Sequence, residues 1–201
     1  MRFLQQLSHR TLALVAAGLW LICILLTPPE RTLGTVIRWV FVHASLTQAA
    51  VYLFVLAAVL AVAYLLGREA AGPWMKPIAG AALAWWLLGF VISIIPARMA
   101  WGVWVDFHEP RTQMTLRVIA TALIFLVLIW WIAHPRFTAM ALIIFAILLL
   151  FLVRSTSLIR HPANPIGSSP DPLLPLLYSG ATLFAVLAGV AAAAHWRQKS
   201  A

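Results

Sequence analysis

Residues 137–154 read FTAMALIIFAILLLFLVR, a run whose one charged residue is Arg154 at its end. About 20 predominantly apolar residues are enough to cross about 30 Å of hydrocarbon as a helix. Five further stretches qualify in the same way, with approximate bounds 11–27, 46–66, 76–96, 113–133 and 173–195. The sequence therefore predicts an all-α integral membrane protein with six transmembrane helices, in which residues 1–201 form a single domain.

Composition supports this class and excludes others. The chain is 64% hydrophobic and 9% charged, whereas soluble domains carry about 25% charged residues. Cys23 is the single cysteine, so neither an internal disulfide nor a CxxC or CxxCH motif is available for thiol chemistry or covalent haem attachment. The net charge of +9 comes without a basic run. Arginines placed singly at span ends are typical of residues that contact the lipid bilayer. We therefore expect no nucleic-acid partner.

Six spans put both termini on one side of the membrane, and loops 28–45, 97–112 and 155–172 on the other. Lys and Arg divide equally, seven to each side. Both lysines and the shortest loops fall on the side of the termini, which predicts that the termini are cytoplasmic. The arginines on the opposite side indicate a partner there, because Arg binds carboxylates in a bidentate manner. Phospholipid headgroups and the acidic residues of the same loops are the alternative partners.

One polar connection has an unusual composition. Residues 101–112, the Trp loop, read WGVWVDFHEPRT. Trp101 and Trp104 lie three positions apart, and Gly102 between them lets a ligand approach the backbone closely. Flat aromatic rings beside ionisable groups suit a planar, apolar ligand with a charged edge. Haem is such a ligand.

Two histidines are candidate axial ligands of a haem iron. His43 is predicted to lie just outside the second span and His161 to follow the fifth, both on the side of the Trp loop. Haem iron accepts an imidazole on each face of the ring, so the two loops could bind one haem between them. The alternative is that both are solvent-exposed interfacial histidines. His108 in the Trp loop is a third candidate, as a ligand, a propionate donor or a partner of Glu109.

Three arginines on the same side are candidate partners for the two haem propionates: Arg38, Arg98 and Arg111. Enzyme chemistry finds no comparable support in the sequence. It contains no HExxH, P-loop or GxSxG motif, and its closest pair of acids, Asp106 and Glu109, is typical of loop charges. We therefore expect no catalytic constellation.

Together these residues resemble the haem-handling proteins of cytochrome c biogenesis, most closely the CcmC type. Arg38-x-x-Phe41-x-His43 resembles the family's first His segment, Trp101-Gly102-x-Trp104 resembles the opening of its WGxxWxWD motif, and His161 takes the place of its second His. The resemblance covers residues 35–195. It implies that His43 and His161 ligate haem b while the Trp loop holds the haem edge.

The resemblance also implies partners and a location. A member of this family presents haem at the outer face of the bacterial plasma membrane, beside ABC-transporter-type membrane partners, and passes it to an extracytoplasmic haem chaperone. The chain departs from the family where a third Trp is expected, with Phe107 as a substitute and Glu109-Pro110-Arg111 shifted by one residue. The surface that hands haem to the chaperone is therefore expected to have diverged.

Two other functions are also consistent with the sequence. The chain could be a structural or electron-transfer subunit of a respiratory or photosynthetic complex, derived from the same family. It could also be a small permease or export subunit, although its spans carry few polar residues.

Overall fold

The described part of the chain is helical. The computed structural model describes residues 8–156, 166–167 and 169–200, and in these it contains no strand, only an isolated bridge between Glu30 and Gly34. The elements in chain order are α1 (His9–Leu25), α2 (Ile37–Leu65), the short 3-10 helix η2 (Glu69–Ala71), α3 (Gly72–Trp101), α4 (Pro110–Ile132), α5 (Pro135–Ser155) and α6 (Leu173–Ser200).

Helices α2 to α6 are long and apolar enough to cross a membrane. Helix α1 is apolar but has only 17 residues, about 25 Å at 1.5 Å per residue, which is shorter than the hydrocarbon layer. The prediction of an all-α, multi-pass membrane protein is confirmed, with five helices that meet the length requirement and a shorter sixth.

Two helices extend beyond the expected spans, at places that matter for the site. Helix α2 begins at Ile37, nine residues before the expected start at 46, and α3 continues to Trp101, beyond the expected end at 96. Both helices are about 45 Å long, which exceeds the thickness of the hydrocarbon layer. Hydropathy identifies only the apolar part of a helix, so it did not indicate the more polar ends of α2 and α3.

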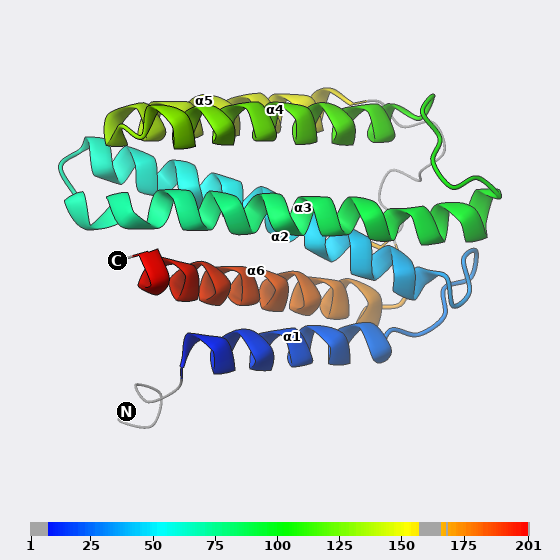
Figure 1. The fold of residues 1–201 in the computed structure, drawn as a ribbon. Helices are drawn as coiled ribbons and strands as arrows, with labels where there is room; N and C mark the ends of the chain where they lie inside the picture. Colours follow the sequence, from blue (N-terminus) through cyan, green and yellow to red (C-terminus); the bar gives the residue numbers. More distant parts are fainter. Residues whose placement is uncertain (1–7, 157–165, 168, 201) are drawn as a thin grey trace.

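The helices stack in layers (Figure 1). Helices α4 and α5 form one outer layer and α2 and α3 the middle layer. Helix α6 packs on the other side of the middle layer, and α1 packs mainly on α6. The start of α1 and the end of α6 lie at one end of the bundle, here called the terminal end. The α1–α2 and α3–α4 connections lie at the opposite, Trp-loop end.

Small residues and a few large rings make the core. Ala50, Ala57 and Ala61 of α2 are fully buried, and small side chains let membrane helices approach closely. Phe54 of α2 meets Phe145 of α5 edge-on, with ring centroids 4.8 Å apart. The layers are therefore joined by packing that leaves the long apolar side chains of the outer helices facing lipid.

Candidate functional site

His43 lies inside a helix and not in a loop before it. It occupies the second turn of α2, a helix long and apolar enough to cross a membrane, so the segment expected to be a loop before the second span is helical at this point. Its Nδ1 is 3.1 Å from the carbonyl oxygen of Trp39, one turn earlier. A carbonyl can only accept, so Nδ1 donates to it, and in the neutral ring the lone pair then lies on Nε2. This is the tautomer in which an imidazole ligates a metal through Nε2.

The packing of α2 on α3 fixes the depth of His43. The backbone of Gly89 in α3 faces the carbonyl oxygen of His43, which a Cβ at that position would approach to 3.1 Å. Arg98 follows nine residues later and Trp101 twelve, about 13 and 18 Å further along α3. Between Lys76 and Arg98 the helix carries no charge over about 33 Å, close to the thickness of the hydrocarbon. His43 therefore lies well below the level of Arg98.

The turn that carries His43 is held on two sides. Ser45 accepts a hydrogen bond from Nε1 of Trp20 in α1, at 2.9 Å. Tyr178 in α6 donates to the carbonyl oxygen of Ala44, at 3.3 Å, and its ring packs edge-on against Phe41 at 5.5 Å between centroids. Polar groups from three helices thus meet at this level. A fixed backbone of this kind is what orients a ligand side chain.

Arg111 reaches the same neighbourhood from α4. It is half-buried in the first turn of that helix, and its guanidinium interacts electrostatically with the carboxylate of Glu109 and the phenol of Tyr178. Because Tyr178 also bonds the carbonyl of Ala44, the charge of Arg111 lies near the His43 turn. The structure therefore brings Arg111 and His43 towards one region of the bundle.

The Trp loop begins with a left-handed turn. Gly102 caps α3 with φ of +74°, a conformation that glycine adopts without cost, and its carbonyl oxygen accepts a hydrogen bond from Arg98 Nη1. The same guanidinium lies 5.4 Å from the ring centre of Trp104. Trp104 is 61% exposed, so the pair forms a ledge with a flat apolar face and a cation at its edge.

The rest of the Trp loop is built from its own hydrogen bonds. The backbone N–H of His108 donates to Oδ1 of Asp106 at 3.0 Å, and its Nδ1 lies 3.6 Å from the same oxygen. Gln113 donates to the carbonyl oxygen of Phe107 at 2.9 Å, and the Phe107 side chain is 63% exposed. Phe107 thus adds a second exposed ring, while His108 is engaged with Asp106 and not with Glu109.

Arg38 has a different role from Arg98 and Arg111. Its Nε donates to the carbonyl oxygen of Thr27 at 3.0 Å and ties the start of α2 to the end of α1. The nearby turn is closed by Glu30, which accepts from the N–H groups of Thr32 at 2.8 Å and Leu33 at 2.9 Å. These bonds hold the pKa of Glu30 below its ordinary value, the bond from Leu33 contributing most.

The second expected ligand, His161, lies outside the described residues. In the described ranges, no group of three or more His, Cys, Asp or Glu side chains gathers as a metal site. A haem needs fewer protein ligands than such a group supplies. The imidazole of His43 and the Trp104–Arg98 ledge are groups of the kinds that a haem requires, a nitrogen donor and an apolar surface beside a cation.

Fold and site define a helical multi-pass membrane protein with an aromatic, cationic Trp-loop end. No family model matches the chain, and no curated protein matches it. The CcmC-type assignment therefore stays a prediction from the residues quoted above.

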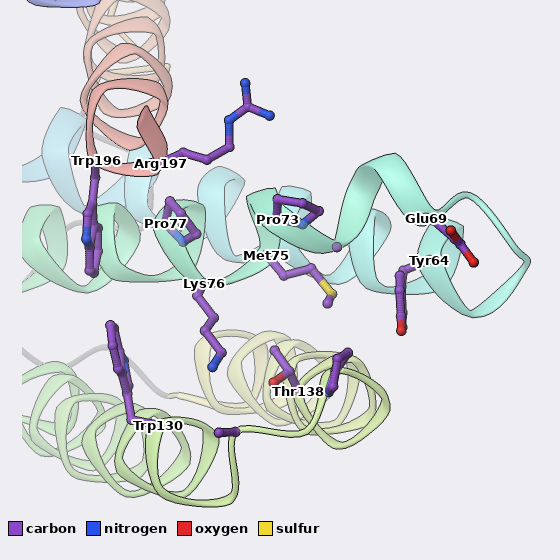
Figure 2. A pocket seen from close by; sticks show the side chains of 13 residues that line it. Tyr64, Glu69, Pro73, Met75, Lys76, Pro77, Trp130, Thr138, Trp196 and Arg197 are labelled. Carbon is purple, nitrogen blue, oxygen red and sulfur yellow. The ribbon is translucent and has the colours of Figure 1, made fainter. Parts of the chain in front are cut away.

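A second feature of the structure was not predicted from the sequence. At the terminal end, the α2–α3 turn, the α4–α5 turn and the last turn of α6 surround a cavity of about 580 Å³ (Figure 2). Lys76, Trp130, Trp196 and Arg197 line it; in the sequence they are typical of an interfacial belt. The sequence contained one indication of this cavity, because Trp and cationic residues occur at three span ends. It did not indicate that those three ends lie close together.

Proposed function

We propose that this protein binds haem b at the Trp-loop end and handles it during cytochrome c maturation. His43 and His161 are the proposed axial ligands. The protein's task is to orient the haem at the membrane surface and to release it to an acceptor. No covalent step is assigned to its own residues.

The observation that carries the proposal is the imidazole of His43 inside α2. Ionisable side chains within membrane spans are rare, and they mark functional sites. In the neutral ring, the bond from Nδ1 to the Trp39 carbonyl places the lone pair on Nε2, a nitrogen through which histidines ligate haem. A bis-imidazole haem would also explain why a turn of α2 is fixed by bonds from both α1 and α6.

The other proposed residues hold the rest of the haem. The Trp104 ring supplies an apolar face, and Arg98 stands at its edge, where a propionate carboxylate is attracted. Arg111 supplies a second cation near the His43 turn. Arg38 fixes the start of α2 through Thr27, so its proposed effect on a propionate comes with a structural role. Trp101 and Gly102 set the direction in which the loop leaves α3.

The proposal includes a topology and partners. All six helices would cross the plasma membrane of a bacterium, with both termini in the cytoplasm and the Trp loop outside. The acceptor would be an extracytoplasmic haem chaperone, and ABC-transporter-type membrane proteins would be neighbours. An exposed Trp104 and Phe107 give a chaperone an aromatic surface to contact, in place of the third Trp that the family motif has.

Loss of the gene tests this function. In the bacterium that encodes it, deletion should abolish covalent haem in c-type cytochromes, seen as loss of haem-stained bands. Wild type should restore the bands, His134→Ala should restore them equally, and His43→Ala should not. His134 is the matched control because it is an exposed histidine at the terminal end. Unchanged c-type cytochromes in the deletion strain would contradict the proposal.

A permanent subunit of a respiratory or photosynthetic complex is the second candidate. It is favoured by one observation, the engagement of Arg38 and Arg98 with backbone carbonyls of their own chain, which is what a purely structural arginine does. Haem that copurifies with a large complex and cycles between redox states without leaving would support this candidate over haem delivery.

A further inference from the structure

The cavity at the terminal end has the chemistry of an anion site. Two cations line it, Lys76 from the start of α3 and Arg197 from the end of α6, against one acid, the exposed Glu69. In the described part of the chain neither cation forms an ion pair with a carboxylate. Lys76 Nζ lies 5.4 Å from the centre of Trp130, and Arg197 lies 4.1 Å from the centre of Trp74. Aromatic rings thus hold both positive charges in place without neutralising them.

A buried hydroxyl faces the same space. Thr138 in the first turn of α5 lines the cavity with 1% of its surface exposed, and within the described residues its Oγ1 has no hydrogen-bond partner. A helical threonine commonly bonds the carbonyl four residues earlier, but here the His134 carbonyl accepts only from the Thr138 backbone N–H, at 2.9 Å. Figure 2 shows Thr138 across the space from Lys76. A buried hydroxyl is costly unless it bonds, so a ligand oxygen in this cavity would satisfy it.

Apolar walls complete the site. Trp130 and Trp196 stack with centroids 6.0 Å apart and an angle of 16°. The Trp196 ring lies against Gly80, where any side chain would collide with it, and Met75 is buried beside the cavity. The ligand is therefore an amphiphile with an anionic head and an apolar body. The volume is in the range of small-molecule sites.

We propose that this cavity binds a phosphate ester at the membrane surface, with the headgroup of an anionic phospholipid as the first source. Lys76 takes a phosphate oxygen, Thr138 donates to an ester or phosphate oxygen, and the tryptophans cover the glycerol and first methylenes. The guanidinium of Arg197 lies over Trp74 on the other side of α3 (Figure 2), so it adds positive charge at the rim without contacting the phosphate. Basic pockets between transmembrane helices bind such headgroups. Lys76 precedes Gly89, which faces the His43 turn, by 13 residues or about 20 Å along α3, and the site is independent of the haem proposal.

Thermal unfolding of the purified full chain in a neutral detergent tests the site. Phosphatidylglycerol should raise the unfolding temperature, and phosphatidylcholine should not. Lys76→Gln should weaken the apparent phosphatidylglycerol affinity about fivefold, and Arg197→Gln should weaken it less. Arg136→Gln is the matched control, because it removes the same charge at the same end from a residue that does not line the cavity, and it should leave the affinity unchanged.

Thr138→Val separates the binding role of the hydroxyl from folding. Without lipid this variant should unfold at a higher temperature than wild type, since it removes an unsatisfied buried group, and with phosphatidylglycerol its shift should be smaller. A shift produced equally by sn-glycerol 1-phosphate would assign the site to a water-soluble phosphate ester, and no such shift would assign it to lipid. Equal shifts with phosphatidylcholine, or full shifts in both Lys76→Gln and Thr138→Val, would overturn the proposal.

Discussion

Gly89 of α3 lies directly against the turn of α2 that carries His43. A Cβ at Gly89 would come 3.1 Å from the His43 carbonyl oxygen and 2.6 Å from Oγ1 of Thr47, which itself donates to that carbonyl at 2.9 Å. A side chain at position 89 would thus meet the α2 backbone and the hydrogen-bonded hydroxyl of Thr47. Neither group can move without shifting α2. The register of the middle layer, and with it the depth of the proposed haem ligand, depends on a hydrogen atom at position 89.

Gly89→Ala should therefore destabilise the protein. Overpacking costs about 1–3 kcal/mol, which exceeds the gain of about 1 kcal/mol from replacing a helical glycine. Gly18→Ala is the control, because nothing lies within 4 Å of a Cβ there, and it should be neutral or stabilising. Unfolding temperatures of the two variants in detergent should move apart. A Gly89→Ala protein as stable as Gly18→Ala would show that α2 and α3 are not in tight contact at this point.

Low pH should weaken the turn that joins α1 to α2. The N–H groups of Leu33 and Thr32 lower the pKa of Glu30 from its ordinary value of 4.5. A lowered pKa means that the carboxylate stabilises the fold above pH 4.5, and that this contribution is lost as the pH falls through the folded-state pKa. Wild type should lose more stability than Glu30→Gln between pH 6 and pH 3. Parallel stability curves for the two proteins would contradict the hydrogen bonds at Glu30.

Trp104→Ala should lower haem retention without lowering stability. Its side chain is 61% exposed, so truncation leaves no cavity, but it removes the ledge beside Arg98. A lost aromatic contact of about 1 kcal/mol corresponds to about fivefold weaker haem binding. Trp131→Ala, which is 81% exposed at the opposite end, should retain haem as wild type does. Equal retention by both variants, measured by haem titration, would remove the Trp loop from the site.

The proposed topology has a direct test with single cysteines in a Cys23→Ala background. Phe107→Cys lies on the exposed Trp loop, and Arg68→Cys lies in the exposed turn before α3. A membrane-impermeant maleimide added to intact cells should label Phe107→Cys, and should label Arg68→Cys only after the cells are opened. The reverse pattern would place the Trp loop in the cytoplasm, where an extracytoplasmic chaperone could not reach it.

The sequence was sufficient for the helices because a bilayer leaves few choices. Backbone groups in hydrocarbon must bond internally, so each long apolar run has to be a helix. The bounds were less accessible: residues 37–45 include Arg38, His43 and Ser45, and hydropathy treats them as a loop. Their helical state comes from packing, since Trp20 bonds Ser45 and Phe41 packs on Tyr178. Contacts between segments that are distant in the sequence cannot be predicted from local composition.

The same limit applies to the two sites. The Trp loop could be singled out because Trp101, Gly102 and Trp104 are neighbours in sequence. The cavity could not, because Lys76, Thr138 and Arg197 come from segments more than 50 residues apart. Nor could the depth of His43 be predicted, since it follows from the absence of a side chain at Gly89 and not from any residue near position 43.

The absorption spectrum of the purified protein loaded with haem b tests the central claim most directly. Wild type should give a low-spin spectrum with two imidazole ligands, and His43→Ala should convert it to a high-spin form or lose the haem. His108→Ala and His134→Ala should keep the wild-type spectrum. The His108 side chain contacts Asp106, and His134 lies at the terminal end. An unaltered low-spin spectrum in His43→Ala would contradict the account.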